Sequence, residues 1–499
     1  MEPTRCARAP LGYLAYFTGQ AHFWAMRPED AFIKAGNGLA MVSANEVKDM
    51  IALIAGPRKP ARSVQGLGLP YLAAVLEEAG FQAKIFDLYP PSPDTDDPTV
   101  LDQRLADAVA QEHPAIVGVT IHTPAYVERV RLAKFIRERL PETLLIAGGH
   151  HPSAEPAHLL QNSEFDVCVI GEGEETLLEI ARHVADGVGT GLRASPPGDW
   201  LRNVRGVVYK QDSEIVHNPP RPPVSDLDSL PFPAHHLLGL EDYAPHPNLG
   251  IKSQGILTYR GCPMRCVFCL NPQGQRVRGR SPPKVVDEMA RVVKEFGVCG
   301  FNFYDNLFGL SRKLSLAVCE EIIQRRLDMI WDCWTAGDLV DAALAETMKA
   351  AGCVRVGFGA ESGDDEVLVK ARRGFDTAQH QAGIHALQAA GIKVAAFFMI
   401  GLPGESNESV RRTVEFAQRC GADEICLSLH RPYPGTAVWR SPDAFGVRVV
   451  KGPNFEAYIE TEHLSRAAML ERAQWADEEL KRAGVTKSEF LRCDRYAWE

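Results

Sequence analysis

Short apolar runs alternate with amphipathic segments along most of this chain, which limits the fold to a few α/β architectures. Between residues 50 and 180 the runs MIALIAG, AKIFDLY, AIVGVTI, TLLIAGG and FDVCVIG have the length and composition of buried parallel strands, and a helical pattern fills each gap. The first helix, after Pro70, should end at Gly80, where a left-handed cap is expected. Five strands with four helices predict a doubly wound α/β domain over residues 50–190, with its ligand site beyond the carboxyl ends of the strands.

The alternation resumes after a segment rich in proline, glycine and aspartate. Residues 191–250 contain ASPPGD and NPPRPPVSDLDSLPFP, which predict a linker with a small strand pair around GVVYK and EIVHN. Beyond it GILTYRG, GFNFYDN, MIWDCWT, VRVGFGAE, VAAFFMIG and EICLSLH predict six βα units over residues 251–445, a partial (β/α)6 barrel rather than the closed eight. A helical pattern from Leu464 to Ala483 marks a small C-terminal region, 446–499, and residues 1–49 are unassigned.

Charge and hydropathy exclude two classes of partner. The 499 residues include 54 Lys and Arg against 64 Asp and Glu, a net charge of -10, so no overall basic field attracts a nucleic-acid backbone. No window approaches the roughly 18 uninterrupted apolar residues of a membrane-spanning helix, and the amino terminus lacks the pattern of a secretory signal. We therefore expect a cytoplasmic protein that binds neither nucleic acid nor membrane.

Three of the 12 cysteines stand together in the segment TYRGCPMRCVFC, as Cys262, Cys266 and Cys269. They lie on the loop that follows the first predicted barrel strand, at the end of a barrel where catalytic residues gather. A structural zinc site takes four ligands, and a distant residue would have to supply the fourth. An iron-sulfur cubane held by three thiolates instead keeps one iron open to an exogenous ligand.

This CxxxCxxC loop, with the aromatic Phe268 before its last cysteine, resembles the signature of the radical S-adenosylmethionine enzymes. The resemblance implies that Cys262, Cys266 and Cys269 hold a [4Fe-4S] cluster. It also implies that the open iron chelates S-adenosylmethionine and cleaves it to a 5'-deoxyadenosyl radical, with an electron from an external donor such as flavodoxin or ferredoxin. Further contacts with S-adenosylmethionine are implied on successive strand ends, at Asp305, Asn306, Glu361, Ser362, Gly401 and Gly404.

Each of these positions also has an ordinary structural interpretation. The Asp305–Asn306 pair could be a solvated turn, Glu361 a loop acid, and IGLPGES a Gly-Pro turn. Arg260 could be no more than the structural partner of a carboxylate.

The whole arrangement, a five-stranded unit that leads through a proline-rich linker into such a barrel, resembles the cobalamin-binding branch of the superfamily, which includes the class B methyltransferases. The likeness covers roughly residues 50–440 and is carried by GLGLPYLAAVLEEAGF, VGVTIHT, IAGGHHPSAEP and VIGEGEETLLEI. It implies a flavodoxin-like domain whose strand ends border cobalamin. The residues so implicated are Thr120, Thr123, Gly148, Gly149, His150, Gly171, Glu172, Gly173 and Glu174.

The loop after the first strand departs from a pattern known in related cobalamin domains. Those domains carry DxHxxG, whose histidine binds cobalt from below, whereas this chain has GPRKPARSVQGLG, with no histidine from Gly56 to Gly68. This loop therefore cannot supply an imidazole ligand. Arg62 or Gln65 could face the lower side of the cobalt, or both could be solvated loop residues.

Together the two cofactors predict a C-methyltransferase that acts on an unactivated carbon of a small molecule or peptide. A cobalamin-dependent oxidative cyclase or ring-rearranging enzyme would carry the same motifs, and a corrinoid or redox sensor without turnover is a further alternative. After the sixth strand, Tyr433 could relay a proton or hydrogen atom and Arg431 could bind an acidic substrate, or both could belong to a closing turn. We expect three large aromatic residues at strand positions to be core: Trp331, Trp334 and Phe398.

Overall fold

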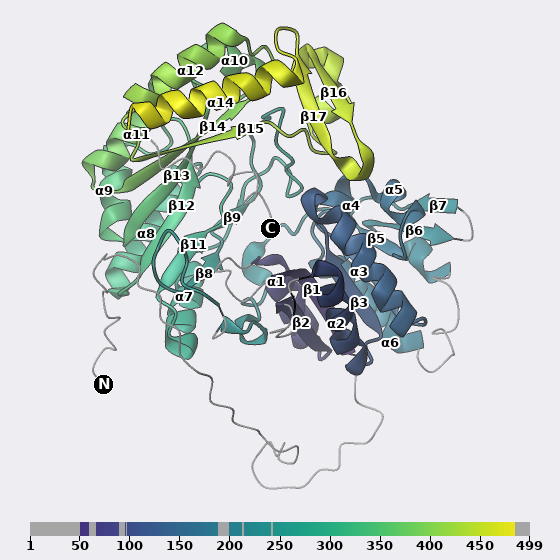
Figure 1. Ribbon diagram of the computed structural model, residues 1–499. Coiled ribbons are helices and arrows are strands. Elements are labelled where there is room, and N and C mark those ends of the chain that lie inside the picture. Colours follow the sequence, from purple (N-terminus) through teal and green to yellow (C-terminus); the bar gives the residue numbers. More distant parts are fainter. Residues whose placement is uncertain are drawn as a thin grey trace.

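The computed structural model describes residues 50–58, 66–88, 95, 97–187, 199–211, 214–240 and 243–484. They form two α/β units that face each other, with a C-terminal helix and hairpin above them (Figure 1). The predictions for Arg62 and Gln65 fall outside the described residues, as does the unassigned amino-terminal segment. Within the described ranges, no helix combines the length and the hydropathy that crossing a membrane requires.

The amino-terminal unit is a single sheet in the strand order β2-β1-β3-β4-β5-β6-β7. All five predicted strands are present and pair in parallel. The strand pair expected inside the linker instead joins this sheet, because β6 pairs antiparallel with β5. The strands are β1 (Met50–Arg58), β2 (Gln82–Leu88), β3 (Ile116–Thr120), β4 (Leu144–Gly148), β5 (Val167–Val169), β6 (Val207–Gln211) and β7 (Glu214–His217).

Helices cover both faces of this sheet, as the doubly wound prediction requires. The first helix ends just before Gly80, which has the expected left-handed backbone with φ 83°. The helices are α1 (Gly68–Glu78), α2 (Pro98–Gln111), α3 (Tyr126–Arg139), α4 (His150–Ala154), α5 (Pro156–Gln161) and α6 (Glu174–Gly187).

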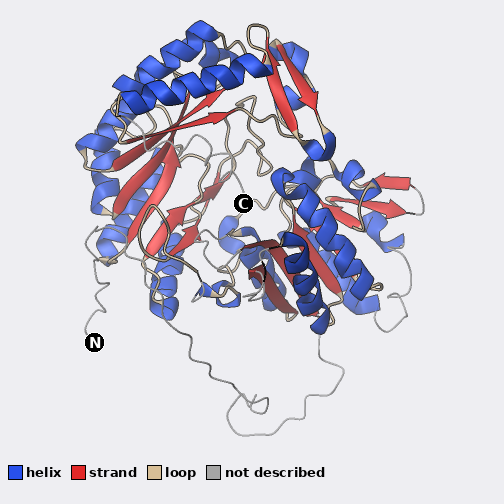
Figure 2. Ribbon diagram, viewed as in Figure 1, coloured by secondary structure: helices blue, strands red, loops and turns tan. Residues whose placement is uncertain are grey.

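The second unit confirms the partial barrel. Six parallel strands follow the order β15-β14-β13-β12-β11-β8, and helices line the outer face of this open sheet (Figure 2). The strands are β8 (Ser253–Ile256), β11 (Gly300–Phe303), β12 (Ile330–Thr335), β13 (Cys353–Glu361), β14 (Lys393–Ile400) and β15 (Glu424–Leu429). The helices are α7 (Pro282–Phe296), α8 (Arg312–Arg325), α9 (Ala342–Ala350), α10 (Asp365–Lys370), α11 (Thr377–Ala389), α12 (Asn407–Arg419) and α13 (Ala437–Arg440).

The aromatic residues expected in the barrel core do not all lie there. Trp331 and Phe398 are buried against the outer helices, as predicted. Trp334 is 44% exposed, so the prediction that it is core was wrong. Trp334 pairs with Gly357, and the next residue, Phe358, packs against His380 of the outer helix α11. Because neighbouring positions on a strand point to opposite faces, Trp334 lies on the inner face of the barrel.

The C-terminal region contains a hairpin that was not predicted from the sequence. The helix appears as expected, as α14 (Arg466–Arg482), but an antiparallel hairpin of β16 (Val447–Lys451) and β17 (Ala457–Thr461) precedes it. The tip of the hairpin reaches the amino-terminal unit, where the ring of Phe455 lies 4.6 Å from His151 and 5.0 Å from Tyr126. The hairpin therefore ties the end of the barrel to α3 and α4.

Candidate active site

The three cysteines lie on a loop whose ends are joined by a short antiparallel ladder of β9 (Tyr259–Arg260) and β10 (Arg278–Gly279). Gly261 begins the loop with φ 93°, and a Cβ atom there would come within 2.1 Å of the Arg276 carbonyl oxygen. Only glycine fits this position. The Cys262 amide then donates to the Gly274 carbonyl at 3.0 Å, which closes the base of the loop.

The middle of the loop is held by the barrel. The buried Val267 donates its amide hydrogen to the carbonyl of Ala371 at 3.0 Å, and its own carbonyl accepts from the amide of Val438 at 3.2 Å. These bonds place the cysteines above the carboxyl ends of the strands. Cys262 and Cys266 are partly buried and Cys269 is exposed.

The chemistry of the three thiols fits a cationic iron cluster. Burial raises the pKa of the partly buried Cys262 and Cys266 thiols, so a positive charge is needed to hold them as thiolates at neutral pH. A single-ion zinc site fits less well, because the described residues bring no three His, Cys, Asp or Glu side chains close enough to bind one metal ion. In a cubane each thiolate binds its own iron.

Arg373, which was not among the residues predicted from the sequence, connects the cysteine loop to the predicted S-adenosylmethionine contact Glu361. Its guanidinium lies 3.7 Å from Cys266 Sγ and 3.6 Å from Glu361 Oε1, and it donates to the carbonyl of Gly359 at 2.8 Å. Burial raises the pKa of Glu361 and the charge of Arg373 opposes that rise. The adjacent arginines in KARRGF were the signal in the sequence, but nothing there indicated which of them turns inward.

Glu361 has an unusual backbone that favours a functional role. It is a non-glycine residue with φ 67°, at a register shift between β13 and β14. Such conformations are costly and concentrate at ligand sites. Glu361 and Arg373 together offer an acceptor and a donor pair beside the cluster loop, which suits the ribose hydroxyls, the amino group and the carboxylate of S-adenosylmethionine.

Changing Arg373 to lysine tests this bridge. Lysine keeps the charge but cannot reach Gly359, Glu361 and Cys266 at once, because it lacks the planar fork of arginine. We expect 5'-deoxyadenosine formation to fall about tenfold to a hundredfold, the usual effect of losing a group that orients metal or cofactor ligands. The assay is paired with iron analysis. Full activity in Arg373→Lys would contradict the role assigned to the fork.

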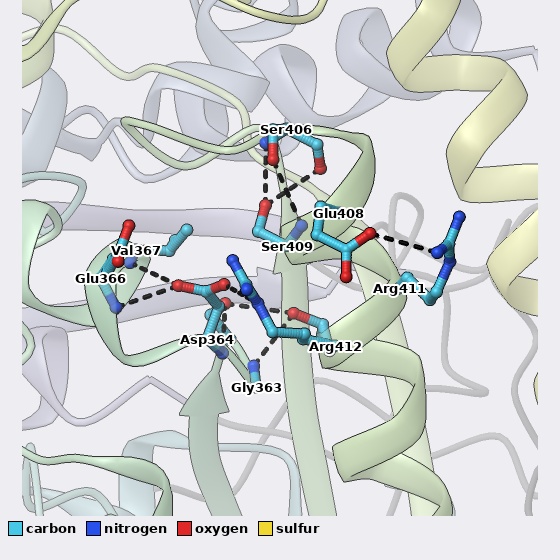
Figure 3. A network of polar contacts seen from close by, with 11 residues as sticks. Gly363, Asp364, Glu366, Val367, Ser406, Glu408, Ser409, Arg411 and Arg412 are labelled. Atoms are coloured by element: carbon cyan, nitrogen blue, oxygen red, sulfur yellow. Dashed lines mark hydrogen bonds and ion pairs between the residues drawn. The ribbon is translucent and has the colours of Figure 1, made fainter.

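Ser362 is buried next to Glu361 in the chain, and its hydroxyl is engaged inside the protein. It lies 3.1 Å from Thr413 Oγ1 on α12, and the same hydroxyl of Thr413 accepts from the amide of Gly363 at 3.0 Å. Asp364 caps α10 and pairs with Arg412 at 2.5 Å (Figure 3). This network holds the end of β13 against α12 and thereby positions Glu361, whereas direct contact of Ser362 with a cofactor stays a prediction.

Asp305 and Asn306 follow β11, as expected, but they have different surroundings. Asp305 is buried, accepts from the Thr258 amide at 2.7 Å and from the Thr258 hydroxyl, and has its pKa raised by burial to about 6. Asp305 is therefore not part of a solvated turn, and it fixes the turn between β8 and β9. Asn306 is exposed. Contact of this pair with the amino group of S-adenosylmethionine stays a prediction.

The Gly401–Ser406 turn after β14 is stabilised by hydrogen bonds to Glu405, within the turn, and to His430. The amide of Gly401 donates to the buried carboxyl of Glu405, and the Gly401 carbonyl accepts from His430 Nδ1 at 3.0 Å. A Cβ atom at Gly404 would come within 2.3 Å of the Lys370 side chain. Both polar backbone groups of Gly401 are thus already used, and close approach of this turn to adenine stays a prediction.

Glu405 provides a pH test of this turn. Burial raises its pKa to about 8, so the native carboxyl keeps its proton where an unfolded chain, with a pKa of about 4.3, has lost it. Its contribution to stability is complete below about pH 4.3 and is lost as the pH rises toward 8. Between about pH 5.5 and 7.5 we expect the free energy of unfolding to fall by about 2 kcal/mol more in the parent chain than in Glu405→Gln. Urea unfolding of the cofactor-free proteins measures this, and parallel pH profiles would contradict it.

The carboxyl ends of β3 to β5 carry the predicted cobalamin contacts. Gly148 and Gly171 face open space, since a Cβ atom at either would meet nothing within 4 Å, which suits the close approach of a bulky ligand. His150 stacks near His122, with ring centroids 4.9 Å apart, and burial lowers the pKa of His150. His122 is an addition to the predicted set.

Other members of the set are engaged within the protein. Thr123 is buried and its hydroxyl lies 3.1 Å from His151 Nδ1, whereas Thr120 is only partly buried at the end of β3. A Cβ atom at Gly149 would approach the Ile121 carbonyl at 3.1 Å, and one at Gly173 would approach the Leu72 side chain at 3.2 Å. Because these residues pack against other parts of the protein, fewer of the predicted residues border open space for cobalamin than the sequence indicated.

Glu172 and Glu174 contact arginines of the cluster loop. Glu174 Oε1 accepts from Arg260 Nη2 at 2.6 Å, and Glu172 accepts from Arg278 at 2.6 and 2.9 Å. All four side chains are nearly fully buried. Because Arg260 and Arg278 form the ladder that closes the cysteine loop, these ion pairs join that loop directly to the amino-terminal unit. Arg260 therefore pairs with a carboxylate, which is the structural role that the sequence analysis considered for it.

The turn after β15 lies where three parts of the molecule meet. A Cβ atom at Gly435 would come within 2.8 Å of Leu270, on the cysteine loop, and 2.9 Å of Ala154, on α4. Tyr433 in this turn is partly buried and Arg431 is exposed. Their place beside both candidate cofactor sites is compatible with substrate contact, and their catalytic roles stay predictions.

Comparison with known proteins agrees with this geometry. Residues 58–181 match the B12 binding domain and residues 256–417 match the radical SAM superfamily. An uncharacterized methyltransferase of Pyrococcus horikoshii is 30% identical over 376 residues, which cover 75% of this chain and 77% of that protein. The anaerobic magnesium-protoporphyrin IX monomethyl ester cyclase of Cereibacter sphaeroides is 29% identical, over 78% of this chain and 61% of its own.

A solved structure has the same fold over most of its length. The radical S-adenosylmethionine methyltransferase TsrM from Kitasatospora setae, with cobalamin and a [4Fe-4S] cluster bound, superposes with a TM-score of 0.68 at 20% identity, over 87% of this chain and 89% of TsrM. The paired domains, the three-cysteine loop and the relative in Pyrococcus lead to one conclusion: this chain belongs to the cobalamin-binding radical S-adenosylmethionine enzymes, of the class B methyltransferase type, whose cofactors are a [4Fe-4S] cluster, S-adenosylmethionine and cobalamin.

Proposed function

We propose that this enzyme transfers a methyl group to an unactivated carbon of a small molecule or peptide. The observation that carries the proposal is the direct junction of the two cofactor sites, in which Arg260 and Arg278 of the cluster loop pair with Glu174 and Glu172 of the cobalamin-binding domain. When bound, the cluster with S-adenosylmethionine supplies a radical that removes hydrogen from carbon, and cobalamin supplies the methyl group.

The residues of the chain then have positioning tasks. Glu361 and Arg373 orient S-adenosylmethionine beside the cysteine loop, since Arg373 lies 3.7 Å from Cys266 Sγ and 3.6 Å from Glu361 Oε1. The edge formed by Gly148 and Gly171 admits the corrinoid without steric conflict. Tyr433 and Arg431 lie on the turn between the two sites, where a substrate would pass. We propose that the electron comes from a separate carrier such as flavodoxin or ferredoxin, and that the enzyme works in the cytoplasm.

The test is anaerobic reconstitution with iron, sulfide and cobalamin, followed by analysis of the S-adenosylmethionine products. Methyl transfer consumes two molecules and should give both S-adenosylhomocysteine and 5'-deoxyadenosine in the presence of substrate. Turnover that yields 5'-deoxyadenosine alone would contradict methyl transfer.

A second candidate is a cobalamin-dependent oxidative cyclase or rearranging enzyme, favoured by the 29% identity to the magnesium-protoporphyrin ester cyclase. The same product analysis separates it from the first, because a cyclase releases no S-adenosylhomocysteine. The sensor hypothesis has no comparable support, since the relative in Pyrococcus and the superposed TsrM are both named as methyltransferases.

A further inference from the structure

Trp334 is an aromatic side chain with a large exposed surface inside the barrel. Its register partner on β13 is Gly357, and a Cβ atom at Gly357 would come within 2.8 Å of the indole ring. The indole ring therefore packs against the backbone of β13 at Gly357, where a larger residue would collide with it. Phe397 on β14 lies beside it, with ring centroids 4.6 Å apart and planes at 46°.

The strand pairing shows which face of the sheet these rings occupy. Gly357 pairs with Ala395, and Gly359 pairs with Phe397, so small residues surround the two rings on the same face. Phe358 and Phe398, the neighbours in sequence, point the other way and pack toward His380 and Phe416 of the outer helices. The two rings therefore form a floor on the inner face of the barrel, hereafter the aromatic floor.

A buried polar cluster fills the amino ends of three strands below Trp334. Asn302 on β11 donates to Asp332 on β12 at 2.6 Å and accepts from Ser253 on β8 at 2.6 Å. His246, from the segment before β8, reaches the same asparagine at 3.4 Å. Asp332 lies two residues before Trp334 on the same face of β12, so the open side of the indole faces the carboxyl ends of the strands.

The distance to the chemistry follows from the strand geometry. Glu361 is four residues beyond Gly357 on β13, but its side chain turns back along the strand, since a Cβ atom at Gly359 would come within 2.7 Å of Glu361 Oε1. Gly359 is two residues from Gly357, which corresponds to about 7 Å at 3.3 Å per residue. A group resting on Trp334 is thus separated from the carboxylate of Glu361 by roughly the length of one ring. Binding energy from such a remote part of a substrate serves to place the reacting carbon.

We propose that the aromatic floor of Trp334 and Phe397 binds a planar conjugated ring of the substrate, and that the reacting carbon lies on the end of the molecule toward Glu361. An indole left 44% exposed inside a protein costs hydrophobic free energy, which the stacking of a flat apolar ring recovers. The indole Nε1 has no hydrogen-bond partner among the described residues, so it also offers a donor to a polar edge of that ring. The inference rests on the proposed function, because it names the substrate class of the same site.

The experiment compares two carboxylic acids that differ in the ring alone, indole-3-butyrate and 4-cyclohexylbutyrate. Their binding to the anaerobic holoenzyme, with cluster and cobalamin bound, is measured by equilibrium dialysis. We expect the indole acid to bind about tenfold more tightly than the saturated acid, and we expect Trp334→Leu to remove that preference. Trp334→Phe, which keeps an aromatic face, should retain most of it.

Trp475→Leu is the matched control, since this tryptophan lies on α14, where Arg472 packs 6.0 Å from its ring. Iron and cobalamin content establish that each variant is folded. Equal binding of the two acids to the parent enzyme, or an unchanged preference in Trp334→Leu, overturns the aromatic floor. Neither result bears on the proposed methyl transfer, which is contradicted instead if turnover gives no S-adenosylhomocysteine.

Discussion

Replacing Cys266 with alanine is expected to abolish reductive cleavage of S-adenosylmethionine, a loss of at least about a thousandfold. Cys266 is one of three thiols available to the cluster, and its side chain is also the one that Arg373 approaches. With two thiolates left, the cubane loses a ligand and iron retention falls. The measurements are iron content, which should be roughly four per chain in the parent enzyme, and anaerobic 5'-deoxyadenosine formation.

Cys319→Ala is the control, because that cysteine is buried in α8 with the apolar core. It should keep its iron and its activity. A Cys266→Ala protein that still cleaves S-adenosylmethionine would remove the radical assignment altogether.

Replacing Arg260 with alanine is expected to cost about 3–5 kcal/mol of stability, because it leaves the carboxylate of Glu174 buried without its partner. The charge of Arg260 also lies 3.6 Å from Glu172 and 5.1 Å over the ring of Tyr71, so three contacts between the domains are lost together. Urea unfolding of the cofactor-free protein measures the cost. Cobalamin retention measures the effect on the junction, and it should fall in parallel.

Two further variants make this result specific. Arg312→Ala removes an exposed ion pair with Asp341, of similar length at 2.6 Å, and should cost less than about 1 kcal/mol. Arg260→Leu combined with Glu174→Leu removes both charges and should recover much of the lost stability, since neither charge is left uncompensated. If Arg260→Ala costs no more than Arg312→Ala, the buried pair does not hold the domains together.

Much of the fold could be predicted from the chain alone, because the information is local. Most of the strands of both units are largely apolar runs, although β8 begins with Ser253 and Gln254, ahead of the run predicted there. Gly80 ends the first helix where its left-handed backbone was expected. The hairpin of β16 and β17 was missed because each of its strands has a single buried residue and therefore no buried run. The pair β6 and β7 was found, but its place in the first sheet was not.

In the candidate site, too, some residues could be predicted from the sequence and others could not. The positions of Cys262, Cys266 and Cys269 follow from their spacing, and Glu361 from its place at the end of a strand. By contrast, Arg260 and Glu174 are 86 residues apart, so no pattern in the sequence could pair them.

The sequence by itself determined the two domains and their order, because strand periodicity is a property of short segments, and the resemblance of its short motifs to a known family implied the cofactors. Only the tertiary structure decided that Glu172 and Glu174 pair with the cluster loop and that Trp334 is exposed on the inner face of the barrel. The physical reason is that the burial of a side chain and the partner of a charge depend on which distant segments pack against it, and packing is settled only when the whole chain has folded.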